Sequence, residues 1–238
     1  MKLVNTKIWK TIKKNKIVYG FIHNTIGKHI NQKKMNERIK EMINNGEDCI
    51  AQVETVLKKT DIIFFTDFGT LLGFVREGKT LSWDYDIDYG IIIKSDGQWN
   101  DLHKAMSGIG FKLIKQFSYK GVVTEKTYGR GNIYIDFFRH FVSEKDSHYY
   151  VYYTKQGYSY QSDNMMHVRM TTTVRITETK EFDVDNGTVS VPLEYEKYLE
   201  DVFGEDWRIP NPNWVASAKD NITFLDGFGL LLEYDKNN

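Results

Sequence analysis

Cysteine and proline are scarce in this chain, and each shortage limits its architecture. The 238 residues include one cysteine, Cys49, which excludes an intrachain disulfide or a multi-cysteine zinc site and fits a reducing compartment. The three prolines, Pro192, Pro210 and Pro212, leave no proline-rich linker. No apolar run approaches the roughly 18 residues that a membrane-spanning helix needs. The remaining class is a globular chain with one substantial core, to which an apolar fraction of 41% is well suited.

Net charge is also lacking, yet the charges are segregated along the chain. Residues 1–40 contain eleven Lys or Arg and one acidic residue, Glu37, so the remainder has an excess of ten acidic side chains. This asymmetry predicts two different partners for the two regions. The basic N-terminus lacks the uninterrupted apolar core and the cleavage site of a secretory signal, so we expect it to be retained.

We divide the chain into a basic amphipathic helical extension, residues 1–45, and a main domain, residues 46–238. A helix with lysines beside apolar and aromatic residues is typical of contact with anionic lipid. Residues 1–40 are therefore predicted to bind the inner face of the plasma membrane, which makes the protein cytoplasmic and peripheral. Docking of this helix on its own domain or on a protein partner is the alternative, and nucleic acid is not an expected partner. Apolar residues recur every four positions at Val4, Ile8 and Ile12.

The order of the expected elements predicts an α+β fold, with a mixed β-sheet flanked by helices. Helices are predicted over residues 47–59, 69–76, 101–108 and 193–203. Strands are predicted over residues 61–66, 86–93, 111–117, 132–138 and 168–176. No Gly-x-Gly-x-x-Gly motif follows a strand, so a doubly wound dinucleotide fold is not expected.

Three aspartates alternate along one short stretch of the chain. Asp84, Asp86 and Asp88 would share one face of an extended strand, because successive side chains point to opposite faces. Like charges at this spacing repel one another, so the stability of the fold gives no reason to place them there. Carboxylate oxygens are ligands that Mg²⁺ or Mn²⁺ prefers. We therefore predict a metal at Asp86 and Asp88. Asp84 is expected to contact substrate, with metal ligation or the capping of a turn as the alternatives. For the three acids together, the alternative is a solvated acidic edge.

A glycine-threonine pair lies about fifteen residues before these acids. Gly69 has no Cβ, so a ligand can approach its backbone, and Thr70 offers an N–H and a hydroxyl group. At the start of a helix, these donors favour an anion such as phosphate. Arg76, further along the same helix, is a candidate clamp for that phosphate, although an ion pair with Glu77 is an alternative. The alternative interpretation of Gly69-Thr70 is an ordinary helix start that binds no ligand.

A fourth candidate acid, Asp136, lies within the predicted strand 132–138. An unpaired carboxylate there would be costly to bury between Ile135 and Phe137. A metal ion or a general-base role would explain it. A structural ion pair with Arg130 or Arg139 is the other interpretation.

Taken together, these motifs resemble those of the LicD family, which includes bacterial phosphocholine transferases and the animal fukutin and fukutin-related proteins. The blocks that resemble the family are Gly69-Thr70-Leu71-Leu72-Gly73-Phe74-Val75-Arg76, Trp83-Asp84-Tyr85-Asp86-Ile87-Asp88, Ile135-Asp136-Phe137-Phe138 and the stretch from Val191 to Trp207. The resemblance implies a nucleotidyltransferase-like fold. It also implies a Mg²⁺- or Mn²⁺-dependent transfer of a substituted phosphate from a CDP-linked donor to a sugar hydroxyl.

The acidic block departs from the bacterial choline-type pattern Ile-Pro-Trp-Asp-Asp-Asp-Ile-Asp. Leu81-Ser82 replaces Ile-Pro, and Tyr85 replaces the middle acid. The block is more similar to that of fukutin-related protein, which transfers ribitol phosphate. The transferred group is therefore expected to be an alditol phosphate, ribitol or glycerol phosphate, with phosphocholine or phosphoethanolamine as alternatives.

The resemblance also implies roles for the residues. Asp86, Asp88 and Asp136 would be the catalytic acids that bind metal, while Gly69, Thr70, Arg76 and Asp84 would bind substrate. The acceptor would be an oligosaccharide or lipid-linked glycan of the cell surface, and CMP would leave. Three other functions stay open: an NTP-dependent nucleotidyltransferase, a metal-dependent glycosyltransferase, and an inactive module that binds glycan or membrane.

Overall fold

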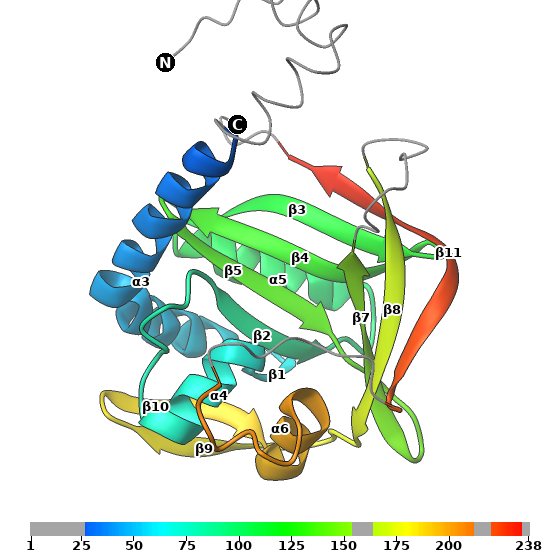
Figure 1. The fold of residues 1–238 in the computed structure, drawn as a ribbon. Coiled ribbons are helices and arrows are strands. Elements are labelled where there is room, and N and C mark those ends of the chain that lie inside the picture. Colours follow the sequence, from blue (N-terminus) through cyan, green and yellow to red (C-terminus); the bar gives the residue numbers. More distant parts are fainter. Residues whose placement is uncertain (1–26, 154–163, 212–219, 235–238) are drawn as a thin grey trace, which may run out of the picture.

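The computed structural model describes residues 27–153, 164–211 and 220–234. Its main element is a nine-stranded sheet in the order β1-β2-β5-β4-β3-β11-β8-β7-β6 (Figure 1). β2 and β5 run parallel, and the other neighbouring strands run antiparallel. The expected mixed sheet is thus confirmed. The strands are β1 (Ile63–Thr66), β2 (Ile87–Ile92), β3 (Lys112–Tyr119), β4 (Val122–Arg130), β5 (Ile133–Arg139), β6 (Phe141–Val142), β7 (Asp146–Tyr153), β8 (Met165–Val174) and β11 (Ile222–Glu233).

In the described ranges, four helices and a hairpin surround the sheet. α3 and α5 pack together, α3 against β5 and α5 against β3, whereas α4 and α6 lie near the β9–β10 hairpin (Figure 1). Their bounds are α3 (Gly27–Leu57), α4 (Phe68–Glu77), α5 (Gly97–Gly108), α6 (Tyr195–Phe203), β9 (Thr179–Val184) and β10 (Gly187–Pro192). No helix in the described ranges is long and apolar enough to cross a membrane.

α3 is one continuous helix where two were predicted. It runs through Gly46, the position at which residues 1–45 and 47–59 were separated. Its second half is held by burial, because Met42, Ile50 and Val53 are each at most 3% exposed. This packing outweighs the weak helix propensity of Asn44, Asn45 and Gly46. Residues 1–26 of the predicted extension lie outside the described residues.

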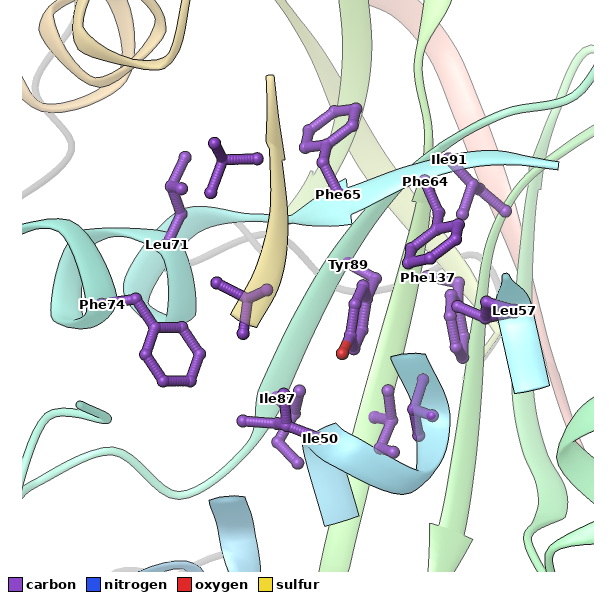
Figure 2. Close-up of a cluster of buried hydrophobic side chains, with 14 of the residues drawn as sticks. Ile50, Leu57, Phe64, Phe65, Leu71, Phe74, Ile87, Tyr89, Ile91 and Phe137 are labelled. Atoms are coloured by element: carbon purple, nitrogen blue, oxygen red, sulfur yellow. The ribbon is translucent and has the colours of Figure 1, made fainter. Parts of the chain in front are cut away.

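The core lies between α3 and the inner strands. Tyr89 of β2 and Phe137 of β5 stack with their ring centroids 5.6 Å apart, and both are fully buried. Figure 2 shows these two rings beside Ile50 and Leu57 of α3. Because side chains alternate along a strand, Asp88 and Asp136 point to the opposite face of the sheet. The apolar residues of β2 and β5 thereby fix the direction of their acidic neighbours.

Several strands lie outside the predicted ranges, among them β4 and β11, and one helix starts earlier than expected. β4 includes Glu125 and Lys126, which are 8% and 9% exposed, and charged residues argue against a central strand. β11 contains Asp226-Gly227, a turn signal, but the strand continues through a bulge at which Gly227 has a φ of 86°. α5 begins at Gly97, so Asp101 does not cap it as the pattern suggested.

Candidate active site

A pocket of about 550 Å³ opens on the face of β5 that points away from α3. α4, the loop before β2, and strands β5, β7 and β8 form its walls together with α6. Six of the seven predicted site residues line it: Gly69, Arg76, Asp84, Asp86, Asp88 and Asp136. The seventh, Thr70, lies behind the wall. These six residues come from three separate segments of the chain, 69–76, 84–88 and 136, which therefore meet at one cavity.

Asp88 and Asp136 are direct neighbours on the parallel strands β2 and β5. On the next strand, Thr127 lies opposite Asp136 and hydrogen-bonds to its side chain. The Oδ1 atom of Asp136 is buried and has no hydrogen-bond partner within the described part of the chain. Arg130 and Arg139 do not pair with Asp136, because they donate to the carbonyl oxygens of Ile109 and Ile93 at 2.7 and 3.1 Å. The structural ion pair that was an alternative for Asp136 is thus not formed.

The other two acids reach the pocket from a loop and not from a strand face. β2 begins at Ile87, so Asp84 and Asp86 precede it, and the prediction that all three acids share one strand face is wrong. Asp84 ends a turn in which its N–H donates to the carbonyl oxygen of Leu81 at 3.0 Å, and its own carboxylate accepts from the N–H of Tyr85 at 3.2 Å. The turn still directs Asp84 and Asp86 into the same pocket.

Burial raises the pKa of all four predicted acids of the pocket, and repulsion by neighbouring carboxylates adds to this effect at Asp86 and Asp88. The pKa of Asp86 is raised to about 8, mainly by burial and in addition by repulsion from Asp136 and Asp84. Burial raises the pKa of Asp84 to about 6. The pKa of Asp88 is raised well above its usual range by burial and by repulsion from Asp86 and Asp136. Such a cluster is unfavourable without a cation.

The basic groups that compensate these acids come from outside the pocket lining. Lys115 of β3 and Arg38 of α3 both lower the pKa of Asp86 and of Asp136. Arg38 also stacks over the ring of Tyr134 on β5, 3.7 Å from its centroid. Nothing in the sequence pattern connected either residue with the acids, because this electrostatic effect depends on the sheet register and on the length of α3.

No three His, Cys, Asp or Glu side chains in the described part of the chain are arranged as a set that could hold a metal ion. Mg²⁺ commonly takes one or two protein carboxylates and completes its shell with water and substrate phosphate oxygens. Asp86 and Asp88, together with the unpartnered oxygen of Asp136, fit that chemistry. These residues could hold a metal jointly with a phosphate ligand.

α4 presents its N-terminus to the pocket. Asp67 caps the helix by accepting from the N–H of Phe68 at 2.7 Å, and the N–H groups of Gly69 and Thr70 have no acceptor among the described residues. A Cβ at Gly69 would lie 2.9 Å from Oδ2 of Asp84, which explains the glycine. The hydroxyl group of Thr70 accepts the N–H of Asp88 at 2.9 Å, so it fixes β2 and does not face a ligand. Gly69 and the helix start remain suited to an anion.

A buried polar network behind α4 was not predicted. Asp67 is fully buried and lies 2.9 Å from Nε2 of His140, and it also accepts a short hydrogen bond from the hydroxyl group of Tyr198 on α6. This network joins the start of α4 to the end of β5 and to α6. No spacing in the sequence links these three residues.

Two arginines line the pocket. Arg76 pairs with Glu77 at 3.0 Å, as the alternative interpretation proposed, but its Nε atom is buried and has no acceptor. Arg169 of β8 was not predicted at all, and its Nε atom is likewise buried without an acceptor. The pocket therefore combines an acidic group with unsatisfied guanidinium donors.

The nucleotidyltransferase domain model of the LicD/FKTN/FKRP family matches residues 61–195, more than half of the chain. The chain belongs to the LicD family. Its matched residues include α4, the acidic loop, β5 and β8, so the LicD domain contains most of the pocket. α3, which contributes Arg38, and β11 lie outside the matched range.

The similarity to individual relatives is shorter. A stretch of 53 residues is 36% identical to ribitol 5-phosphate transferase FKRP of Mus musculus and, equally, of Homo sapiens. That stretch covers 22% of this LicD-family chain and 11% of each relative. The chain thus matches about a tenth of the length of these curated relatives.

Proposed function

We propose that this LicD-family protein is a metal-dependent phosphotransferase. It moves a substituted phosphate from a CDP-linked donor to a sugar hydroxyl of a cell-surface glycan and releases CMP. The observation that carries the proposal is the pairing of Asp88 with Asp136 on adjacent parallel strands, in one pocket with Asp86 and Gly69. Family membership supports the reaction class, and the similarity to a ribitol 5-phosphate transferase favours an alditol phosphate as the transferred group.

In the proposed mechanism, Asp86 and Asp88 hold Mg²⁺ or Mn²⁺. When bound, that ion neutralises charge on the donor diphosphate. The N–H groups of Gly69 and Thr70 donate to a donor phosphate oxygen, and Asp84 packs against Gly69 and keeps this turn in position. Asp136 accepts the proton of the acceptor hydroxyl, a role that suits its unpartnered Oδ1 atom and the pKa that burial raises.

In the proposed displacement, the acceptor oxygen forms a bond to the phosphorus of the transferred group, and its proton goes to Asp136. The bond from that phosphorus to the bridging oxygen of the diphosphate breaks, and the electron pair stays on the oxygen that leaves with CMP. The carboxylates and the helix start hold the two reacting groups in line.

The test is a panel of CDP-linked donors: CDP-ribitol, CDP-glycerol, CDP-choline and CDP-ethanolamine, each with Mg²⁺ and a glycan acceptor. CMP and the modified acceptor are followed by mass spectrometry. We expect CMP release with an alditol donor, loss of release in EDTA, and loss in Asp88→Asn. The matched control is Asp101→Asn, an exposed acid on α5. Pyrophosphate release from an NTP, with no CMP from any donor, would contradict the proposal.

A further inference from the structure

Arg169 is a pocket residue to which neither the family match nor the sequence pattern assigns a role. It lies on β8 between Val151 of β7 and Phe224 of β11, and its side chain faces the pocket. Its Nε atom is shielded from water and has no acceptor among the residues that the structure describes. A buried donor that is left unpaired costs free energy of about 1–3 kcal/mol, so its persistence needs an explanation.

Other arginines of the domain are paired. Arg130 and Arg139 donate to backbone carbonyl oxygens, Arg175 donates to the carbonyl oxygen of Ser143 at 2.8 Å, and Arg208 pairs with Glu196. Arg169 forms no ion pair with any residue in the described ranges, although acidic side chains are numerous in the same pocket. Its charge is therefore available to a ligand.

The position of Arg169 separates it from the acidic group. Arg169 lies on β8 and Asp136 on β5, and β4, β3 and β11 lie between these two strands in the order of the sheet. The nearby acid Asp201 is already engaged, because it accepts the N–H of Val174 at 2.7 Å and pairs with Lys197. A ligand group at Arg169 is thus an anion, and it lies apart from the cation that we propose at Asp86 and Asp88.

The surroundings of Arg169 also suit an aromatic group. α6 packs against β8, and it ends at Phe203, which lines the pocket as Trp207 does just after the helix. Ring surfaces and a guanidinium group that line one pocket suit a nucleotide, the rings for its base and the guanidinium group for its phosphate. A sugar or alditol phosphate would use the guanidinium group but not the rings.

We infer that Arg169 binds the phosphate of the nucleotide that leaves, so that one pocket holds the donor between a carboxylate end and an arginine end. This inference rests on the proposed transfer from a CDP-linked donor. When the bond to the bridging oxygen breaks, negative charge develops on CMP, and a guanidinium group held at its phosphate stabilises that charge. Arg169 then contributes to binding of CMP itself, without any divalent ion.

The experiment measures CMP binding by the full chain in EDTA, from the fluorescence of Trp83 and Trp207, which line the pocket, and by calorimetry. The variants are Arg169→Gln and Arg169→Lys, and the matched control is Arg175→Gln, whose side chain lies outside the pocket lining. We expect Arg169→Gln to weaken CMP binding by about ten- to hundred-fold, because a charge-assisted, bidentate contact is lost. Arg169→Lys should retain part of the affinity, since lysine keeps the charge but not the fork, and Arg175→Gln should bind as the unchanged chain does.

Ribitol 5-phosphate and inorganic phosphate are the comparison probes. If Arg169→Gln weakened ribitol 5-phosphate but not CMP, the arginine would belong to the transferred group, and the inference would be overturned. It is equally overturned if the unchanged chain binds no CMP in EDTA, or if Arg169→Gln binds CMP normally. Thermal unfolding controls for folding, and Arg169→Gln should be at least as stable as the unchanged chain because it removes an unpaired buried donor.

The test of Arg169 can fail or succeed independently of the test of the proposed transfer. CMP binding that depends on Arg169, with no turnover of any CDP-linked donor, supports the inference and removes the proposed transfer. If Arg169→Gln turns over a CDP-linked donor with an unchanged KM, the proposed transfer is supported and the role of Arg169 is overturned. Both results are read from the same purified variants.

Discussion

At the scale of single residues, the acids of the pocket oppose stability, and we propose that they bind metal. Asp86, Asp88 and Asp136 repel one another in a partly buried site. We predict that Asp88→Asn raises the thermal midpoint in EDTA at pH 8, by roughly 2–4 °C for each kcal/mol of repulsion that it removes. The same change should lower transfer by about a thousand-fold, as for other lost electrostatic stabilisers. Differential scanning fluorimetry and CMP release measure the two effects, and Asp101→Asn should change neither.

The same repulsion predicts a pH dependence of stability. An unfolded aspartate has a pKa of about 3.9, and the folded protein raises that of Asp86 to about 8. The folded state therefore binds more protons than the unfolded state between these values, so its free energy of unfolding falls as pH rises through this window.

Thermal midpoints in EDTA should accordingly decline from pH 5 to pH 8, and the decline should be smaller in Asp86→Asn. Mg²⁺ should restore stability at pH 8, because it binds the folded state alone. Stability in EDTA that rises steadily over this range would contradict the assignment of the acids as a repulsive cluster.

At the scale of elements, the Asp67 network fastens α4 and α6 to the sheet. Tyr198 is fully buried and donates to Asp67, so Tyr198→Phe leaves part of a buried carboxylate without a donor. We predict a loss of about 1–3 kcal/mol in the free energy of unfolding, with an unchanged m-value, measured by urea denaturation.

Tyr195→Phe on the same helix is the matched control for this prediction. Its ring packs on Phe182 and beneath Lys180, and both contacts survive the loss of the hydroxyl group. Transfer activity should fall in Tyr198→Phe and not in Tyr195→Phe, because α4 presents the N–H groups that we propose bind the donor phosphate. Equal stabilities of the two variants would mean that the network does not hold the helices.

Local patterns predict the elements that bear the acids, and they do not predict what surrounds them. Alternation along β2 and β5 follows from apolar residues such as Ile87 and Phe137, so the direction of Asp88 and Asp136 could be inferred from sequence. The end of α4 at Gly78, whose φ is 71°, was also signalled locally. These signals depend on neighbours within a few residues.

The residues that were missed lie on elements joined only by the tertiary fold. Arg169 reaches the pocket because β8 and α6 meet, and Arg38 reaches the acids because α3 continues past the predicted break. Asp67 looks like an ordinary helix cap until His140 and Tyr198 enclose it. Contacts of this kind depend on register and helix length, which periodicity does not encode.

At the scale of the whole molecule, the basic N-terminal region and the acidic pocket are connected through α3. Arg38 belongs to this helix, stacks on Tyr134 and lowers the pKa of Asp86, while the later turns of the helix form the core. A cut between residues 45 and 46 would divide α3 and remove both Arg38 and the buried Met42. Residues 27–45 therefore contribute to the site, whereas a role at the membrane has to be tested on residues 1–26.

Residues 1–26 contain six lysines and no acidic residue, and we predict that they bring the protein to anionic membranes. Each lysine near such a surface contributes on the order of 1 kcal/mol. A chain lacking residues 1–26 should therefore bind vesicles with anionic lipid at least about tenfold more weakly than the full chain. Flotation with anionic and with neutral vesicles measures this, and binding by the full chain should weaken as salt rises.

A full-length chain with its first six lysines changed to glutamine is the control, because it separates charge from chain length. Transfer between soluble substrates should be the same for all three proteins, since the pocket residues lie beyond residue 26. Transfer to a glycan anchored in anionic vesicles should fall only where the lysines are missing. Equal vesicle binding by all three would place membrane contact elsewhere, and the segregation of charge along this chain would then need a protein partner to explain it.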